Sequence, residues 1–130
     1  MKSFGKIFGV LAVALAFAMT AGHVSAEFKE DYSSAAFEQA QADGKHIVVE
    51  VFKQGCGTCA AQQPALEAAR AAHPDAVFLK FDFVNNTEAV KRFKVVKQST
   101  IIVFKGNDEL ARVIGETDKD KLLDLIKQGA

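Results

Sequence analysis

The sequence lacks several features that would point to particular classes of protein. It has no excess of charge, because 16 lysine and arginine residues balance 16 aspartate and glutamate residues. Without a basic surplus, binding of nucleic acid or of an anionic membrane is not expected. Internal repeats, linkers and low-complexity tracts are also lacking, and a length of 130 residues predicts one domain. Tryptophan is absent, so the 11 phenylalanines should supply the aromatic part of the core.

The N-terminal stretch has the pattern of a secretory signal peptide. A short positive region with two lysines precedes an apolar run over residues 7–21, and small residues follow where a cleavage site after Ala26 requires them. The alternative is an uncleaved membrane anchor, but the apolar run is short for a span of about 20 residues. We therefore expect a cleaved signal peptide over residues 1–26. The mature domain, residues 27–130, is expected in the periplasm without stable membrane insertion.

The two cysteines of the chain, Cys56 and Cys59, are separated by two residues. At this spacing the sulfurs can close a small ring when Cys59 lies in the first turn of a helix. A loop this short removes little entropy from the unfolded chain, so the pair suits a disulfide that opens and closes better than a structural staple. A helix N-terminus favours the thiolate form of a cysteine. Cys56 is therefore expected to be the exposed attacking sulfur and Cys59 the shielded resolving sulfur.

Other uses of the cysteine pair remain open from the sequence. A zinc finger would need two histidines after the second cysteine, and His73 is the single histidine that follows it. Haem attachment would need a histidine directly after Cys59, where Ala60 stands. A soft metal such as Cu(I) could bind both thiolates, with a third ligand from His46, His73 or a partner protein. The last alternative is an inert pair. Export favours redox exchange, because disulfides persist outside the cytoplasm.

The spacing of apolar and turn-forming residues predicts alternating helices and strands. A β-branched run over residues 46–52 indicates a buried strand that leads directly into the cysteine loop. Pro64 lies inside the helix that follows and should kink it. The predicted order is helix 35–41, strand 46–52, helix 59–72, strand 76–84, helix 88–93, a hairpin of strands 100–104 and 109–114 with a loop of three to four residues, and a helix capped at residue 117 or 118.

This order of elements, with C-x-x-C between the first long strand and its helix, resembles the thioredoxin family over nearly the whole of residues 27–130. Several further positions carry the resemblance. They are Glu50 at the place of the family's buried acid, Pro64 at its helix-kinking proline, Lys80 where many members have a lysine beside that acid, and residues 104–106 and Gly115 in and after the hairpin.

The resemblance implies a thioredoxin-like three-layer α/β fold with a central mixed β-sheet flanked by helices. It implies thiol–disulfide exchange with protein substrates through a redox disulfide between Cys56 and Cys59, with no cofactor and no metal. Glu50 is then the catalytic proton acceptor for Cys59. Expected partners are protein thiols or disulfides and a redox partner protein, and a monomer is expected. A non-enzymatic adaptor of the same fold, binding through basic residues between 91 and 97, is a further alternative.

Two positions depart from the family pattern. Gly55 stands where an aromatic residue usually precedes the first cysteine, and Ser99 stands in place of a proline that follows a cis peptide bond. The loop Gln98, Ser99 and Thr100 is expected to bind substrate, as the matching loop of the family does. A cis bond before serine would cost about 2.5–4 kcal/mol. We therefore predict a trans Gln98–Ser99 bond, a displaced loop, and a Ser99 hydroxyl that can hydrogen-bond a thiolate.

Overall fold

The computed structural model describes residues 30–130, so the predicted signal peptide, its cleavage site and the first mature residues lie outside the described part of the chain. Helices and strands alternate as expected for an α/β domain. In chain order they are β1 (Glu30–Asp31), α1 (Ser34–Ala42), β2 (His46–Phe52), α2 (Gly57–Ala72), β3 (Val77–Asp82), α3 (Thr87–Arg92), β4 (Thr100–Lys105), β5 (Asp108–Ile114) and α4 (Lys119–Lys127).

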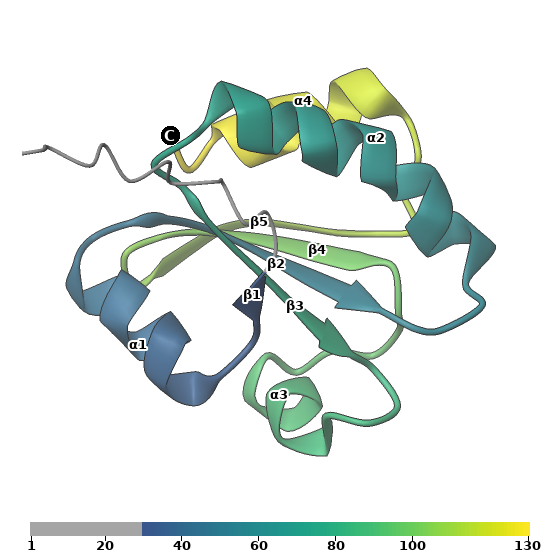
Figure 1. Ribbon diagram of the computed structural model, residues 1–130, viewed down its shortest axis with the longest axis horizontal. Coiled ribbons are helices and arrows are strands. Elements are labelled where there is room, and N and C mark those ends of the chain that lie inside the picture. The colour runs from purple at the N-terminus through teal and green to yellow at the C-terminus, as the bar shows by residue number, and fades with distance from the viewer. Residues whose placement is uncertain (1–29) are drawn as a thin grey trace, which may run out of the picture.

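The strands form one mixed sheet in the order β1-β3-β2-β4-β5, which confirms the predicted mixed sheet (Figure 1). β1, β3 and β2 run parallel, whereas β4 pairs antiparallel with both β2 and β5. β2 is the central strand, and its six buried residues, 46–51, explain the continuous β-branched run in the sequence. The sequence did not predict β1, because a strand of two residues is too short to show a period.

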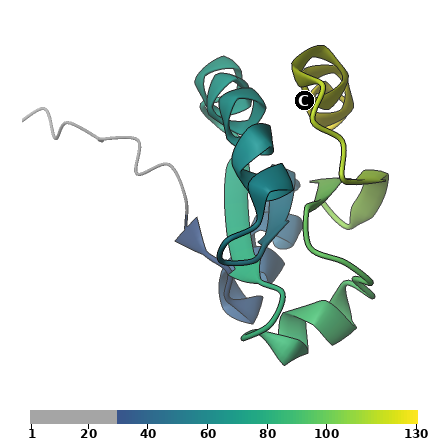
Figure 2. The same cartoon turned by 90° about the vertical axis from the view of Figure 1, so that its right-hand side faces the viewer.

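The helices cover both faces of the sheet and complete the three layers. α2 and α4 lie side by side on one face, and α1 and α3 cover the other (Figures 1 and 2). Residues of β2 alternate between these two cores, so Val48 packs under α2 and α4 while Val49 packs against α1 and α3. The same alternation places Glu50 on the α2 face of the sheet. None of the helices in residues 30–130 has the length and apolar character needed to cross a bilayer.

An aromatic cluster fills the core below the sheet, on the α1 and α3 face. The ring of Tyr32 lies 6.2 Å from Phe37, 5.7 Å from Phe81 and 5.4 Å from Phe93, measured between centroids. Phe93 in turn meets Phe104 of β4 at 6.0 Å. These contacts confirm that phenylalanine supplies the aromatic core of the domain.

The hairpin between β4 and β5 differs from the prediction. A loop of three to four residues was expected, but Lys105 pairs with Asp108, so the turn contains only Gly106 and Asn107. Gly106 has a φ of +55°, which a tight two-residue turn requires and which glycine adopts without a steric penalty. A register shift next to Phe104 takes up the extra residue in the strand. The predicted loop length was therefore wrong, because a bulge and a longer loop cannot be told apart in the sequence.

Candidate active site

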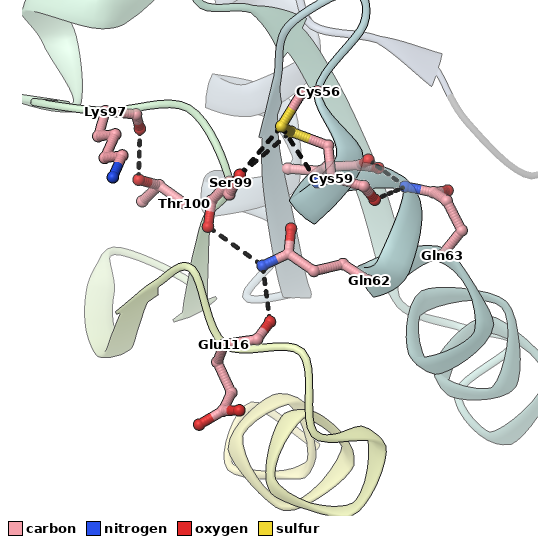
Figure 3. The surroundings of a disulfide bond; sticks show 9 residues. Cys56, Cys59, Gln62, Gln63, Lys97, Ser99, Thr100 and Glu116 are labelled. Atoms are coloured by element: carbon pink, nitrogen blue, oxygen red, sulfur yellow. Dashed lines mark hydrogen bonds between the residues drawn. A yellow bond between two sulfur atoms is a disulfide. The ribbon is translucent and has the colours of Figure 1, made fainter.

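Both cysteines lie at the start of α2, directly beyond the end of β2, and they are joined by a disulfide (Figure 3). Cys56 is the N-cap residue of α2 and is half-buried. Cys59 lies in the first turn and is 5% exposed. α2 therefore begins two residues earlier than predicted, and its N-terminus is built from the cysteine loop itself. The relative exposure of the two sulfurs agrees with the expected order of attacking and resolving cysteine.

The position of Cys56 favours negative charge on its sulfur. The backbone N–H of Cys59 donates to Cys56 Sγ at 3.1 Å. This is the hydrogen bond that the side chain of an N-cap residue normally accepts from the first turn of a helix. The helix dipole places partial positive charge at the same point, and the first turn of α2 carries no acidic residue that would oppose it. A thiolate on Cys56 is therefore stabilised by α2.

Ser99 lies directly opposite the disulfide and contacts both of its sulfurs. Ser99 Oγ is 3.2 Å from Cys56 Sγ and 3.2 Å from Cys59 Sγ (Figure 3). Sulfurs joined in a disulfide carry no hydrogen, so the hydroxyl is the donor in both contacts. The peptide bond before Ser99 is trans, which confirms the predicted geometry of this bond. The displaced course predicted for the loop stays a prediction.

The backbone of Ser99 is held in an unusual conformation. Its φ is +62°, a left-handed value that costs a residue with a Cβ atom about 1–3 kcal/mol. Its amide donates to the carbonyl of Val51 at 2.8 Å, and its carbonyl accepts from the amide of Gly115 at 2.9 Å. Gln62 Nε2 donates to the same carbonyl at 3.1 Å. Both main-chain groups of Ser99 are therefore used inside the fold.

The flanking residues of this loop have different surroundings. Thr100 is 1% exposed, and its hydroxyl donates to the carbonyl of Lys97 at 2.6 Å, so its side chain shapes the loop. Gln98 is half-buried and is the most accessible of the three residues predicted to bind substrate. A direct role of Gln98, Ser99 and Thr100 in substrate binding stays a prediction.

Glu50 lies under the first turns of α2, as predicted for a buried acid. It is 4% exposed, and Gln63 Nε2 donates to its Oε1 at 2.6 Å. The same amide donates to the carbonyl of Cys59 at 3.2 Å, so Gln63 connects Glu50 to the resolving cysteine. Glu50 and both cysteines also line one cavity of about 420 Å³. A proton could therefore pass between Cys59 and Glu50 through water in this cavity.

Arg70 is a site residue that the sequence analysis missed. It is 7% exposed, its guanidinium lies 3.8 Å from Glu50 Oε2, and it stacks on the ring of Phe78 at 5.2 Å. Burial lowers the pKa of Arg70, and the negative charge of Glu50 partly opposes that shift. The available signal was its spacing, because Arg70 follows Leu66 by four residues and falls on the apolar face of α2.

Lys80 was expected to lie beside Glu50, and the sheet register confirms that the two are neighbours on adjacent strands. The ion pair of Lys80 is with Asp31, at 3.8 Å, and its ammonium lies 5.6 Å from the centroid of Phe52. Lys80 also lines the cavity next to the disulfide. It therefore adds positive charge at the cavity, and Arg70 adds a second positive charge next to Glu50.

The metal-binding alternative is wrong in its intramolecular form. His46 begins β2 and His73 caps the end of α2, whereas the cysteines lie where β2 ends and α2 begins. A strand of seven residues spans about 20 Å, so neither histidine can reach the sulfurs. The two imidazoles instead contact each other, with ring centroids 5.1 Å apart. Residues 30–130 contain no group of three potential ligands suited to a metal ion.

Comparison with known proteins places this site in a family. A family model described as Thioredoxin matches residues 28–128. The chain belongs to the thioredoxin family. Thioredoxin from Chlamydia pneumoniae is 34% identical over 98 residues, which cover 75% of this chain and 95% of that protein. Thioredoxin from Chlamydia trachomatis is 33% identical over 82 residues, covering 63% of this chain and 80% of the relative.

Solved structures give the same result for the thioredoxin fold. The crystal structure of Trxlp from Edwardsiella tarda superposes with a TM-score of 0.72 at 37% identity, covering 75% of this chain and 97% of the other. Thioredoxin from Fasciola hepatica gives a TM-score of 0.64 at 31% identity, covering 74% and 93%. The chain is a thioredoxin-type thiol–disulfide oxidoreductase with a C-x-x-C redox pair.

Proposed function

We propose that this protein is an exported thioredoxin that exchanges disulfides with protein substrates through Cys56 and Cys59. The observation that carries the proposal is the arrangement of the disulfide at the N-terminus of α2, with Cys56 partly exposed and Cys59 buried. A substrate can reach Cys56 but not Cys59, so Cys56 is the sulfur that reacts first with a partner. Protein thiols or disulfides and a redox partner protein are the proposed partners.

The exchange has two steps in the reducing direction. The Cys56 thiolate attacks a sulfur of the substrate disulfide, and the other substrate sulfur leaves as a thiolate. Cys59 then attacks Cys56 Sγ, which closes the Cys56–Cys59 disulfide and releases the second substrate sulfur as a thiolate. The substrate gains two electrons and the protein loses two. Reversal of the same steps oxidises a substrate dithiol.

Glu50 is the proposed proton acceptor in the second step. Cys59 must lose its proton before it attacks, and it is too buried for bulk water to take that proton directly. The cavity shared by Glu50 and Cys59 provides a path, and the ion pair with Arg70 compensates the charge of the acceptor. Gln63 fixes the carboxylate by donating to Oε1.

A Cys59→Ser variant tests the proposed exchange with protein substrates. Without the resolving sulfur, mixed disulfides between Cys56 and substrates should accumulate and appear as bands that a reductant removes. A Cys56→Ser variant is the matched control and should trap almost nothing, because Cys59 is buried. Failure of Cys59→Ser to form mixed disulfides in cells would contradict the proposal and favour an adaptor role or a metal site completed by a partner protein.

Export has its own test, because it rests on residues 1–26 of the sequence alone. Mass spectrometry of the protein isolated from the periplasm should give a chain that begins at Glu27. Replacing Ala26 by arginine should block cleavage, because the peptidase requires a small residue there. Recovery of unprocessed wild-type protein from the cytoplasm would contradict export without affecting the exchange chemistry.

A further inference from the structure

We propose that Ser99 is a catalytic residue, whose hydroxyl donates to whichever active-site sulfur carries negative charge, and that Gln62 is its positioning residue. The inference rests on the proposed disulfide exchange and goes beyond it by assigning a hydrogen-bond donor to both thiolates. Its basis is a single oxygen atom, Ser99 Oγ, at 3.2 Å from Cys56 Sγ and from Cys59 Sγ.

The position of this oxygen suits both halves of the reaction. In the disulfide the hydroxyl hydrogen faces two uncharged sulfurs, which are weak acceptors. When the bond between them breaks, one sulfur becomes a thiolate, and a hydrogen bond to a charged acceptor is about twice as strong as a neutral one. Rotation about the Cβ–Oγ bond directs the hydrogen to either sulfur, so the backbone need not move.

Gln62 holds the Ser99 loop in place from the opposite side. Its side chain is fully buried, and Nε2 donates to the carbonyl of Ser99 at 3.1 Å and to the carbonyl of Glu116 at 2.9 Å (Figure 3). One amide group thereby ties α2, the loop before β4 and the segment after β5 together. A residue at a φ of +62° persists only when its surroundings fix it, and Gln62 supplies part of that constraint.

The donor acts in each step of substrate oxidation. A substrate thiolate attacks Cys56 Sγ, the Cys56–Cys59 bond breaks, and Cys59 leaves as a thiolate that accepts the Ser99 hydroxyl. Cys59 then takes up a proton through the cavity that it shares with Glu50, which releases the hydroxyl. The second substrate thiolate attacks the substrate sulfur of the mixed disulfide, and Cys56 leaves as a thiolate that accepts the hydroxyl in turn. The substrate dithiol loses two electrons and two protons. The protein disulfide gains the two electrons, Cys59 takes one proton, and the other proton goes to solvent.

Stabilised thiolates favour the reduced form of the pair. A more stable reduced form makes a disulfide a stronger oxidant. The Ser99 hydroxyl therefore raises the reduction potential of Cys56–Cys59, in the same direction as the α2 N-terminus. The site is biased toward accepting electrons from substrate thiols, relative to the same site without the hydroxyl.

The test compares reduced wild-type protein with Ser99→Gly, in which the hydroxyl is lost but the positive φ is retained without strain. Titration of the thiolate ultraviolet absorbance should show the pKa of Cys56 raised by about one to two units. Equilibration with glutathione should show the disulfide about 10- to 100-fold less oxidising, which corresponds to about 30–60 mV. Gln62→Met should shift both quantities in the same direction by a smaller amount.

Two further variants separate the hydroxyl from the backbone. Lys94→Gly is the matched control, because Lys94 is the other non-glycine residue of the described chain with positive φ and lies in the same connection; it should titrate as wild type. Ser99→Ala also lacks the hydroxyl and should reproduce the shift of Ser99→Gly. A folded Ser99→Gly protein with the wild-type thiolate pKa would overturn the inference. Failure of the wild type to equilibrate with glutathione would instead contradict the proposed function, since the thiolate titration does not depend on exchange.

Discussion

Glu50 and Glu67 are two carboxylates with opposite surroundings near α2. Glu50 is buried, accepts from Gln63 and pairs with Arg70, whereas Glu67 on α2 is exposed to solvent. Bulk water surrounds the Glu67 carboxylate, whereas Cys59 is 5% exposed and has little direct contact with bulk water. A buried carboxylate that shares a cavity with Cys59 can therefore affect the exchange rate, and an exposed one cannot.

Replacement of Glu50 by glutamine should slow the second exchange step. The amide has nearly the shape of the carboxylate but cannot accept the proton of Cys59, and loss of a general base typically costs about 10²-fold or more. The measurement is the rate at which a mixed disulfide between Cys56 and a model peptide resolves. Glu67→Gln is the control and should resolve at the wild-type rate. Equal rates for wild type and Glu50→Gln would rule out the proton-acceptor role.

At the level of elements, most helices and strands were predictable from the local spacing of apolar and turn-forming residues. The run 46–52 gave β2 at its observed bounds, and Asp118 caps α4 as one of the two expected residues. The cysteines were found from their own spacing and their position at the start of a helix, and Glu50 was found because it matches the buried acid of the thioredoxin family. Gln62, Gln63 and Arg70 were missed, because their role depends on which face of α2 meets β2 and the Ser99 loop, and a polar residue on a helix reads as exposed.

The contact between α2 and β2 through Arg70 and Glu50 should contribute strongly to stability. Arg70→Met leaves the Glu50 carboxylate buried without its cation, which typically costs about 3–5 kcal/mol in the free energy of unfolding. Addition of Glu50→Gln should recover part of the loss, because the double variant has no unpaired charge. Urea unfolding of the single and double variants measures both effects.

The control for this pair is an ion pair at the surface. Arg112 donates to Glu109 at 2.7 Å, but the two side chains are 29% and 39% exposed. Arg112→Met should therefore cost no more than about 1 kcal/mol. Similar losses for Arg70→Met and Arg112→Met would show that burial of the Arg70–Glu50 pair has no energetic consequence.

On the scale of the whole molecule, titratable groups lie at both ends of the sheet. The end near α2's N-terminus holds the disulfide and Glu50, and the opposite end holds His46 and His73. Burial lowers the pKa of His46, and the positive charges of His73 and Lys105 lower it further, while a backbone hydrogen bond at Ile126 opposes the shift. The free energy of unfolding at mildly acidic pH therefore depends on His46, which lies at the end of the sheet opposite the disulfide.

The free energy of unfolding should fall as the pH drops below about 6.5. The unfolded chain binds a proton at His46 near its ordinary pKa of 6.5, whereas the folded chain resists it, so protonation favours unfolding until the lowered pKa is passed. Urea unfolding at several pH values from about 7 to 5 should show this slope in the wild type and a smaller one in His46→Gln. Parallel curves for the two proteins would show that His46 does not contribute.

The aromatic cluster around Tyr32 has a practical consequence for spectroscopy. Tyr32 is the only tyrosine of a chain without tryptophan, and it packs among phenylalanines in the core on the α1 and α3 face, whereas the disulfide lies at the start of α2. Its emission therefore reports on packing of the core between the sheet and the helices α1 and α3. Tyrosine emission can thus be used to follow folding, and thiolate ultraviolet absorbance to follow the redox state. Both signals can be recorded in one sample without an introduced label.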